Sequence, residues 1–137
     1  MLFEKVLTKN DVGATNSHQS GFLIPKSMSS LLSFLPSLDP KILNPSIILP
    51  VYDDRDEIWE FRYIYYNNKL HSKGGTRNEY RITRTTKFMK KQKAKEGDLI
   101  RFTKNKKGHY MIVVVSSIAA HPQEGNKVRL KGWNQVF

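Results

Sequence analysis

The segment Lys73–Arg84, KGGTRNEYRITR, carries side chains that can read the edges of nucleic-acid bases. Arginine offers two donors to guanine, asparagine can pair with adenine, and glutamate accepts a hydrogen bond from the amino group of cytosine. Because side chains alternate along an extended chain, Arg77, Glu79 and Arg81 are expected to project to one side, and Asn78 to the other. An acid lowers attraction for phosphate, so Glu79 is expected to contact a base or to orient an arginine. An ordinary surface strand with an ion-paired glutamate is the alternative.

A second polar group, His18 and Gln19, lies in a run of small polar residues between Gly13 and Gly21. Glutamine can reach the edges of adenine or guanine, and histidine can donate to a base or to a phosphate. A lone histidine is more often a turn cap or a core residue. Because its neighbours here are small and polar, we expect an exposed loop in which both side chains read base edges.

The positive charge of the chain is concentrated in one segment. The formal net charge is +11, and residues 69–107 alone contain 14 Lys and Arg against three acidic residues. A surplus of this size favours a polyanion as partner, although a solvated basic face is the alternative. On a nucleic acid, such cations supply salt-dependent attraction to phosphates. The expected phosphate contacts, polar residues of the first loop included, are Lys9, Asn16, Ser17, Lys26, Lys73, Arg84, Lys90, Lys91 and Arg101.

The acidic residues give only weak support for a nuclease. Restriction-type nucleases hold Mg²⁺ with one acid and with an acid-X-Lys pair on an adjacent strand. Asp53 and Asp54 could provide the first acid, but the later candidates, 60–62 and 79–81, end in arginine, which is a poor base. The histidines lack metal-ligand spacing, and no phosphate-binding loop or Gly-X-Ser-X-Gly motif is present. We expect no catalytic residue, metal or cofactor, and keep a magnesium-dependent nuclease with a degenerate acidic site as an alternative.

The elements that must position these groups are mostly short strands. Alternating or β-branched segments predict strands within residues 2–9, 47–54, 57–68, 78–84, 96–105, 108–118 and 126–133. The apolar spacing after Pro25 predicts a short helix over 25–35, and one or two helical turns are expected within 85–95. No helix of regular length separates the strands, so a parallel sheet is not expected. A mainly β (α+β) fold, arranged as a small antiparallel or half-open barrel, is the most economical solution.

The strand from Trp59 to Tyr66 is rich in aromatic side chains, which raises a second alternative for binding. Aromatic rings on an exposed sheet can stack on unpaired bases, as in small RNA-binding barrels. Here the aromatic residues are distributed over both faces of the strand, which suits a hydrophobic core at least as well. An RNA-binding small barrel is therefore the alternative to a protein that binds duplex DNA.

Length and composition indicate one folded domain over residues 1–137. There is no cysteine, no secretory signal, and no apolar run of the ~20 residues that a membrane helix needs. A cytoplasmic protein without a membrane partner is the expectation, because the absence of cysteine fits a reducing compartment.

Two segments carry a resemblance to a known family. LTKNDVGATNSHQSGFLIPK, residues 7–26, followed by GGTRNEYRITR, resembles the N-terminal effector-binding domain of the EcoRII restriction endonuclease and its relatives. Residues 17–21 and 77–81 are the most specific parts. The segment KEGDLIRF is similar to a late turn and strand of plant B-three transcription-factor domains, which share that fold. The similarity extends from about Phe3 to Val115.

The resemblance implies a DNA-binding pseudobarrel of about seven strands with two short helices. Two arms would grip the major groove of double-stranded DNA, the N-terminal arm being Lys9–Gly21 and the C-terminal arm Lys73–Arg84. Such domains are fused to a nuclease, as in EcoRII and BfiI, or to a GTPase motor, as in the LlaJI system. We therefore expect a recognition domain of a restriction-modification system, itself not an enzyme and a fragment of a larger restriction protein. Its expected base-reading residues are His18, Gln19, Arg77, Asn78, Glu79 and Arg81.

Overall fold

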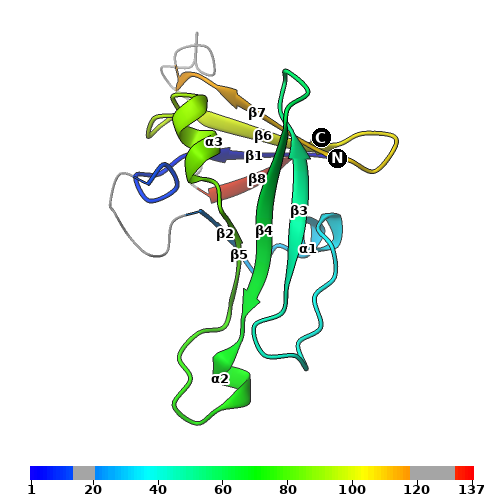
Figure 1. Ribbon diagram of the computed structural model, residues 1–137, viewed down its shortest axis with the longest axis vertical. Helices are drawn as coiled ribbons and strands as arrows, with labels where there is room; N and C mark the ends of the chain where they lie inside the picture. Colours follow the sequence, from blue (N-terminus) through cyan, green and yellow to red (C-terminus); the bar gives the residue numbers. More distant parts are fainter. Residues whose placement is uncertain (14–20, 118–131) are drawn as a thin grey trace.

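The computed structural model describes residues 1–13, 21–117 and 132–137, and its centre is one eight-stranded sheet (Figure 1). The strands, in chain order, are β1 Leu2–Val6, β2 Phe22–Ile24, β3 Ser46–Tyr52, β4 Ile58–Tyr66, β5 Glu79–Thr83, β6 Leu99–Lys104, β7 Tyr110–Val115 and β8 Gly132–Val136. The helices are α1 Ser29–Phe34, α2 Asn68–His71 and α3 Thr86–Lys91. Within the described residues, no helix is long and apolar enough to span a membrane. The mainly β fold predicted from the sequence is confirmed, with eight strands instead of about seven and three short helices instead of two.

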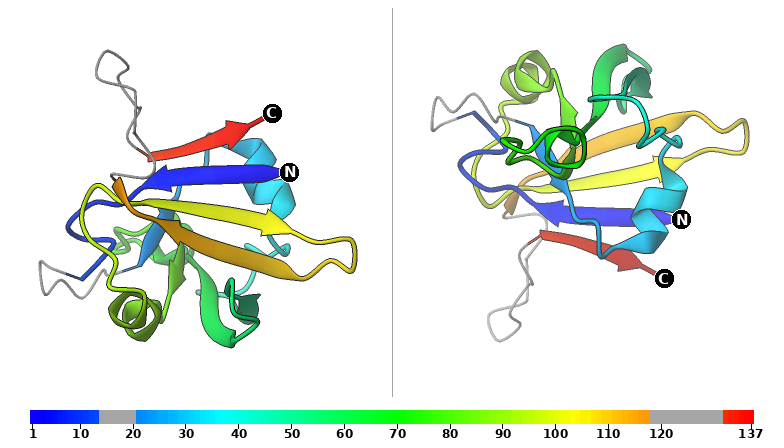
Figure 2. Two further views of the ribbon diagram at one scale, coloured as in Figure 1. Left: turned by 90° about the horizontal axis from the view of Figure 1, so that it is seen from above. Right: turned by 90° about the horizontal axis from the view of Figure 1, so that it is seen from below.

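The sheet consists of two antiparallel halves that meet at one short parallel contact. Its strand order is β2-β5-β4-β3-β7-β6-β1-β8, and the halves divide between β3 and β7. These two strands pair only through Val51 with Tyr110 and Tyr52 with Met111. Seen from above, the half made of β7, β6, β1 and β8 faces the viewer (Figure 2, left). The sheet as a whole is bent into an open pseudobarrel.

The two edge strands, β2 and β8, are connected by a side chain. Trp133 on β8 donates from Nε1 to the carbonyl oxygen of Leu23 on β2 at 3.0 Å. Its ring packs edge-on against Phe22, with ring centroids 6.0 Å apart. A tryptophan, instead of a ladder of backbone hydrogen bonds, thus closes the barrel at this point.

The core is filled by aromatic residues from both halves of the sheet and from α1. Phe61 and Tyr63 on β4 point inward and are each 1% exposed, as strand alternation requires. Phe34 of α1 covers one end of the barrel, and its ring lies 5.0 Å from that of Phe3 and 5.5 Å from that of Phe102. Phe61 and Tyr63, two of the rings of β4 that an RNA-binding barrel would present to bases, are therefore core residues, and the RNA alternative is not favoured.

Three elements differ from the expectations. Phe22–Ile24 forms a strand that sequence inspection left unassigned, because three residues are too few to show an alternating pattern. The end of the segment expected as strand 57–68 instead begins the short helix α2 at Asn68. The last strand is Gly132–Val136, whereas 126–133 was expected, and 126–131 lie outside the described residues.

Candidate nucleic-acid interface

The two arms leave the barrel at opposite ends of the short β2–β5 ladder. Phe22 is opposite Ile82, and Ile24 is opposite Tyr80, in this antiparallel pair. The N-terminal arm therefore reaches the ladder beside Ile82, and the loop of the C-terminal arm reaches it beside Tyr80. The two junctions are only about 7 Å apart along the strands. The described ends of the two arms thus lie on either side of the outer face of β2 and β5, which we call the framed face (Figure 1).

The described root of the N-terminal arm is held by a buried ion pair. The ammonium of Lys5 contacts the carboxylate of Asp11, and the two side chains are only 7% and 6% exposed. The same carboxylate accepts a hydrogen bond from the Thr8 N–H at 2.9 Å, and Thr8 Oγ1 accepts one from the Asp11 N–H at 3.2 Å. These residues line a cavity of about 290 Å³ together with Arg81 of β5. The root of one arm therefore faces the strand of the other.

Gly21 ends the N-terminal arm in a backbone conformation that favours glycine. Its φ is +101°, and a Cβ at this position would lie 2.3 Å from the carbonyl oxygen of Ile82. The arm is therefore pressed against β5 where it enters β2. Four predicted DNA contacts of this arm lie outside the described residues, and their roles stay predictions: Asn16, Ser17, His18 and Gln19.

The base of the C-terminal arm is anchored by a buried asparagine at the end of β4. Asn67 is fully buried, and its Oδ1 accepts a hydrogen bond from the Asn44 N–H at 2.7 Å. Its Nδ2 donates to the carbonyl oxygens of Pro40 and Ile42 at 3.2 and 2.8 Å. Both polar atoms of the side chain are thus bonded, as burial of an amide requires. The loop before β3 is tied in this way to the base of the arm.

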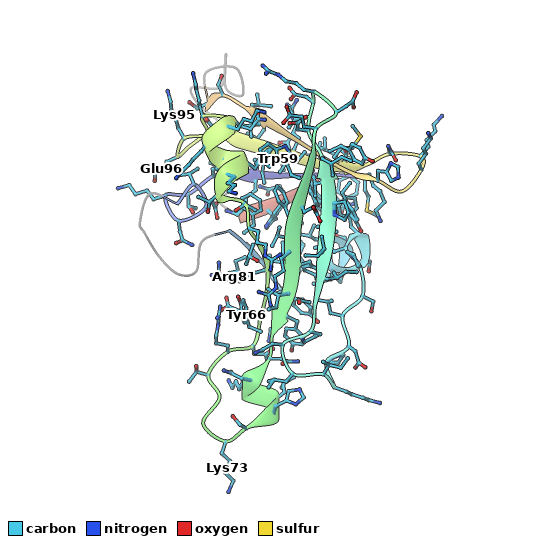
Figure 3. All side chains as sticks on the ribbon, in the orientation of Figure 1. Trp59, Tyr66, Lys73, Arg81, Lys95 and Glu96 are labelled. Carbon is cyan, nitrogen blue, oxygen red and sulfur yellow. The ribbon has the colours of Figure 1, made fainter. Side chains whose placement is uncertain are left out.

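Helix α2 holds the backbone of Arg77 in place. Asn68 Oδ1 accepts a hydrogen bond from the Arg77 N–H at 2.8 Å, and the Lys69 N–H donates to the Arg77 carbonyl oxygen at 3.0 Å. Gly75 lies so close to α2 that a Cβ would be 2.1 Å from the Asn68 carbonyl oxygen. The arm is therefore a packed loop, with Lys73 at its far end (Figure 3).

Glu79 joins two arginines on the outer face of β5. Its Oε1 accepts from Arg77 Nε at 3.1 Å and from Arg77 Nη2 at 2.9 Å, and its Oε2 accepts from Arg81 Nε at 3.1 Å. The Arg77 side chain is 29% exposed, whereas that of Arg81 is 8% exposed. In the β4–β5 ladder, Tyr66 is opposite Glu79, so that its ring belongs to the same face (Figure 3). This is the arrangement expected from alternation, and one carboxylate orients both guanidinium groups.

Asn78 points to the other side of the strand, as alternation predicts. Its Oδ1 accepts a hydrogen bond from the Tyr65 hydroxyl at 2.5 Å. The Tyr65 ring stacks on Tyr80 with centroids 4.1 Å apart. The pKa of the Tyr80 phenol is raised, mainly because the group is buried and to a smaller extent because Tyr65 is close to it. Asn78 is therefore bonded toward the barrel, away from the face that carries Arg77.

The cations predicted to contact phosphates fall into two groups. Lys91 donates to both carboxylate oxygens of Glu57 at 2.9 Å. Arg101 Nε lies 3.2 Å from Glu4 Oε1, on the outer face of the half of the sheet that is turned away from the C-terminal arm (Figure 2). Of the predicted set, the exposed cations that form no ion pair with another described residue are Lys9, Lys26, Lys73, Arg84 and Lys90.

Asp53 organises the turn between β3 and β4. Its carboxylate accepts hydrogen bonds from the Arg55 and Glu57 N–H groups at 2.8 and 2.9 Å and from Trp59 Nε1 at 3.0 Å. Burial favours a raised pKa for the Asp53 carboxyl, but these hydrogen bonds and the charge of Lys91 outweigh it and hold the pKa below its ordinary value. Among residues 1–13, 21–117 and 132–137, no three His, Asp or Glu side chains are grouped to hold a metal. The nuclease alternative is not favoured.

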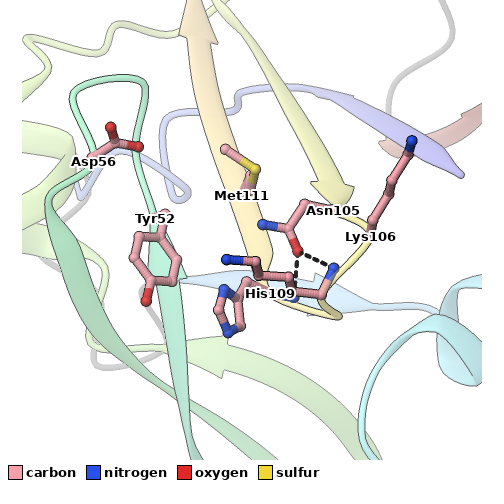
Figure 4. Close-up of a pocket in the computed structure, with 7 residues that line it drawn as sticks. Tyr52, Asp56, Asn105, Lys106, His109 and Met111 are labelled. Carbon is pink, nitrogen blue, oxygen red and sulfur yellow. Dashed lines mark hydrogen bonds between the residues drawn. The ribbon is translucent and has the colours of Figure 1, made fainter.

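A larger cavity, of about 500 Å³, lies between the β3–β4 turn and the β6–β7 hairpin (Figure 4). Tyr52 and His109 stack in it with ring centroids 5.2 Å apart, and Lys106 and Asp56 contribute to its lining. The hairpin projects on the side opposite the N-terminal arm in Figure 1 and in the left view of Figure 2. This cavity is therefore separate from the face that the two arms frame.

Two residues that build the framed face had no role assigned from the sequence. From the sequence, Tyr66 was expected only as the last aromatic residue of a strand, and Asn68 only as the end of that strand. Each acts on Arg77, which is nine or more positions further along the chain. No local pattern indicates such a contact, because it depends on the pairing of β4 with β5.

Comparison with known proteins identifies relatives in two kingdoms of life. The family model "Restriction endonuclease EcoRII, N-terminal" matches residues 1–123. The type II restriction enzyme EcoRII of Escherichia coli is 41% identical over 86 residues, which cover 61% of this chain and 20% of that enzyme. The AP2/ERF and B3 domain-containing transcription repressor TEM1 of Arabidopsis thaliana is 26% identical over 140 aligned positions, 98% of this chain and 35% of the repressor. The chain thus spans between a fifth and about a third of the length of these relatives.

Two solved structures share the fold. The Arabidopsis FUS3–DNA complex superimposes with a TM-score of 0.62 at 22% identity, covering 83% of this chain and 95% of that chain. The B3 domain of the UbaLAI restriction endonuclease, solved with cognate DNA, gives a TM-score of 0.58 at 22% identity, covering 97% of this chain and 84% of that chain. At this level of identity the likeness establishes the pseudobarrel fold.

Proposed function

The chain belongs to the EcoRII N-terminal domain family, and from that membership we propose that it binds double-stranded DNA sequence-specifically through the major groove. The observation that carries the proposal is that the described ends of the two arms join opposite ends of one short ladder, beside an arginine–glutamate–arginine group. The relatives solved with DNA, FUS3 and the UbaLAI B3 domain, have the same fold. A major groove about 12 Å wide accommodates two such projections.

Within this proposal, the residues of the C-terminal arm have different tasks. Arg77 is the donor that reads a guanine, because its side chain is more accessible than that of Arg81, at 29% against 8% exposed. Glu79 orients Arg77, and the buried Arg81 neutralises the second carboxylate oxygen of Glu79. Asn78 supports the arm from inside through Tyr65. His18 and Gln19 supply base contacts from the N-terminal arm.

Phosphate contacts come from the exposed cations without an ion pair to another described residue, together with Asn16 and Ser17. We omit Lys91 and Arg101 from this set. Lys91 is bonded to Glu57, and Arg101 lies on a face turned away from the C-terminal arm. Neutralisation of several phosphates makes the affinity strongly dependent on salt concentration.

Selection of bound sites from random duplexes tests the proposal. We expect one enriched motif, and an affinity for it that exceeds the affinity for a scrambled duplex by about 10³-fold or more. Unlabelled single-stranded RNA should not displace the selected duplex at comparable concentrations. Failure to enrich any motif, or equal competition by RNA, would contradict the proposal.

We further propose that the domain is the recognition module of a larger restriction protein, in which a nuclease or a GTPase motor performs the catalysis. The support is the short share of EcoRII that the chain covers. As a module that only binds DNA, it has no reaction of its own and acts in the cytoplasm. Incubation of the domain with plasmid and Mg²⁺ or Mn²⁺ is expected to leave the plasmid intact. If the domain cuts the plasmid, and the substitution Asp53→Ala abolishes this cutting, the assignment is contradicted.

A further inference from the structure

We propose that Tyr66 is a positioning residue that sets the base preference of Arg77, an inference that rests on the proposed function. The Arg77 guanidinium carbon lies 3.5 Å from the centroid of the Tyr66 ring. This is close contact for a cation over an aromatic face, where the ring quadrupole attracts the charge. The ring therefore restricts where the guanidinium can lie.

Glu79 restricts the orientation of the guanidinium. Its Oε1 accepts from both Nε and Nη2 of Arg77, at 3.1 and 2.9 Å. A guanidinium has five N–H donors, so Nη1 and the second hydrogen of Nη2 stay unused by this carboxylate. These donors form the end of the fork, and two parallel bonds from that end match guanine O6 and N7. The ring and the carboxylate together leave one edge of Arg77 for a base.

The backbone of Arg77 is immobilised independently of Tyr66. Asn68 Oδ1 accepts from its N–H at 2.8 Å, and Lys69 N–H donates to its carbonyl oxygen at 3.0 Å. Loss of the Tyr66 ring would therefore leave the side chain restrained by Glu79 alone, while its Cα stays in place. Tyr66 is also only half-buried, in contrast to its neighbour Tyr65, which is 5% exposed. Its replacement thus tests positioning with little effect on packing.

The experiment compares Tyr66→Leu with Tyr66→Phe in the full domain, against the selected duplex and against duplexes changed at one base pair at a time. Tyr66→Phe keeps the aromatic face, and its affinity should match the original. Tyr66→Leu should weaken binding to the selected duplex about 3- to 30-fold, the factor that corresponds to a cation–π contact. Its preference at one guanine position should fall, whereas its affinity for scrambled duplexes and the salt dependence stay unchanged.

Two further readouts separate positioning from a general structural effect. In an Arg77→Ala background, Tyr66→Leu should cause no additional loss of affinity, because the group that it positions is absent. In the free domain, the Arg77 side-chain proton resonances should be shifted upfield by the ring, and should lose that shift in Tyr66→Leu. An additive double mutant, an equal loss on all duplexes, or the absence of a ring-dependent shift would overturn the inference. A domain that shows the ring-dependent upfield shift of Arg77 but prefers no duplex would contradict the proposed function, and would leave the contact between Tyr66 and Arg77 established.

Discussion

At the scale of single residues, Glu79 forms ion pairs with two arginines of unequal exposure. Arg81 is nearly buried and Arg77 is half-buried, so Arg77 is the more accessible of the two. A carboxylate between two guanidinium groups also limits their attraction to phosphate, because part of their charge is neutralised locally. Such a group favours direct contact with bases over contact with the DNA backbone.

Replacement of Arg77 and of Lys90 by alanine should therefore give different results. Arg77→Ala should cost about 1–3 kcal/mol of binding to the selected duplex and relax the preference at one base pair. Lys90→Ala should weaken binding to selected and scrambled duplexes alike and reduce the slope of log affinity against log salt by about one. Titrations of both variants at several salt concentrations measure this. Indistinguishable behaviour of the two variants would refute the division between base and phosphate contacts.

The lowered pKa of Asp53 predicts how the stability of the fold changes at acidic pH. Its pKa is held below the ordinary value of 3.8, so its contribution to stability is complete above that value and is lost as the pH falls through the lower pKa of the folded state. Asp53→Asn removes the charged acceptor and should lower the free energy of unfolding by about 1–3 kcal/mol at pH 7. The deficit relative to the original protein should shrink below pH 3.8, as measured by urea unfolding. A deficit that stays constant with pH would show that the charge of Asp53 is not responsible.

At the scale of elements, the C-terminal arm depends on close packing of its loop against α2. Gly75 permits this approach, because a Cβ would lie 2.1 Å from a backbone carbonyl oxygen of α2. Gly74 has nothing within 4 Å of its hypothetical Cβ and so offers a matched control in the same loop. The geometry of the arm is thus set by one of two adjacent glycines.

Gly75→Ala should displace the arm loop and reduce affinity for the selected duplex about tenfold or more, since strain of order 1–3 kcal/mol must be relieved by movement of the backbone. Gly74→Ala should bind like the original protein. Amide resonances of β1 and β6, which lie in the other half of the sheet, should be unchanged in both variants. Equal affinities for Gly74→Ala and Gly75→Ala would show that the packed form of the loop is not needed for binding.

The fold and the framed face were predictable from the sequence to different degrees. Alternation along β5 correctly predicted that Arg77, Glu79 and Arg81 share a face, because period 2 is a local property. Strand β2 was not predictable, since its three residues become a strand only by pairing with β5. The anchoring role of Asn67 was equally hidden, because its partners lie 23 to 27 positions earlier in the chain. The ion pair of Lys91 with Glu57 joins positions 34 apart, so the lysine run overstated the number of available cations.

At the scale of the whole molecule, the basic surplus is not one continuous surface. The segment 69–107 includes the C-terminal arm, α3 and β6, and the first residues of the β6–β7 hairpin lie on the side opposite the N-terminal arm (Figures 1 and 2). A duplex held by the arms would therefore meet only some of these cations. The salt dependence of binding should reflect that smaller number instead of the full net charge.

The central claim is that two arms, rooted about 7 Å apart on one ladder, enter the major groove of a single duplex. A crystal structure of the domain with its selected duplex tests this most directly. We expect Lys9–Gly21 and Lys73–Arg84 in the same groove, with the free edge of Arg77 on a guanine. A duplex bound to the outer face of β7, β6, β1 and β8, or to the β6–β7 hairpin with either arm free of DNA, would contradict it.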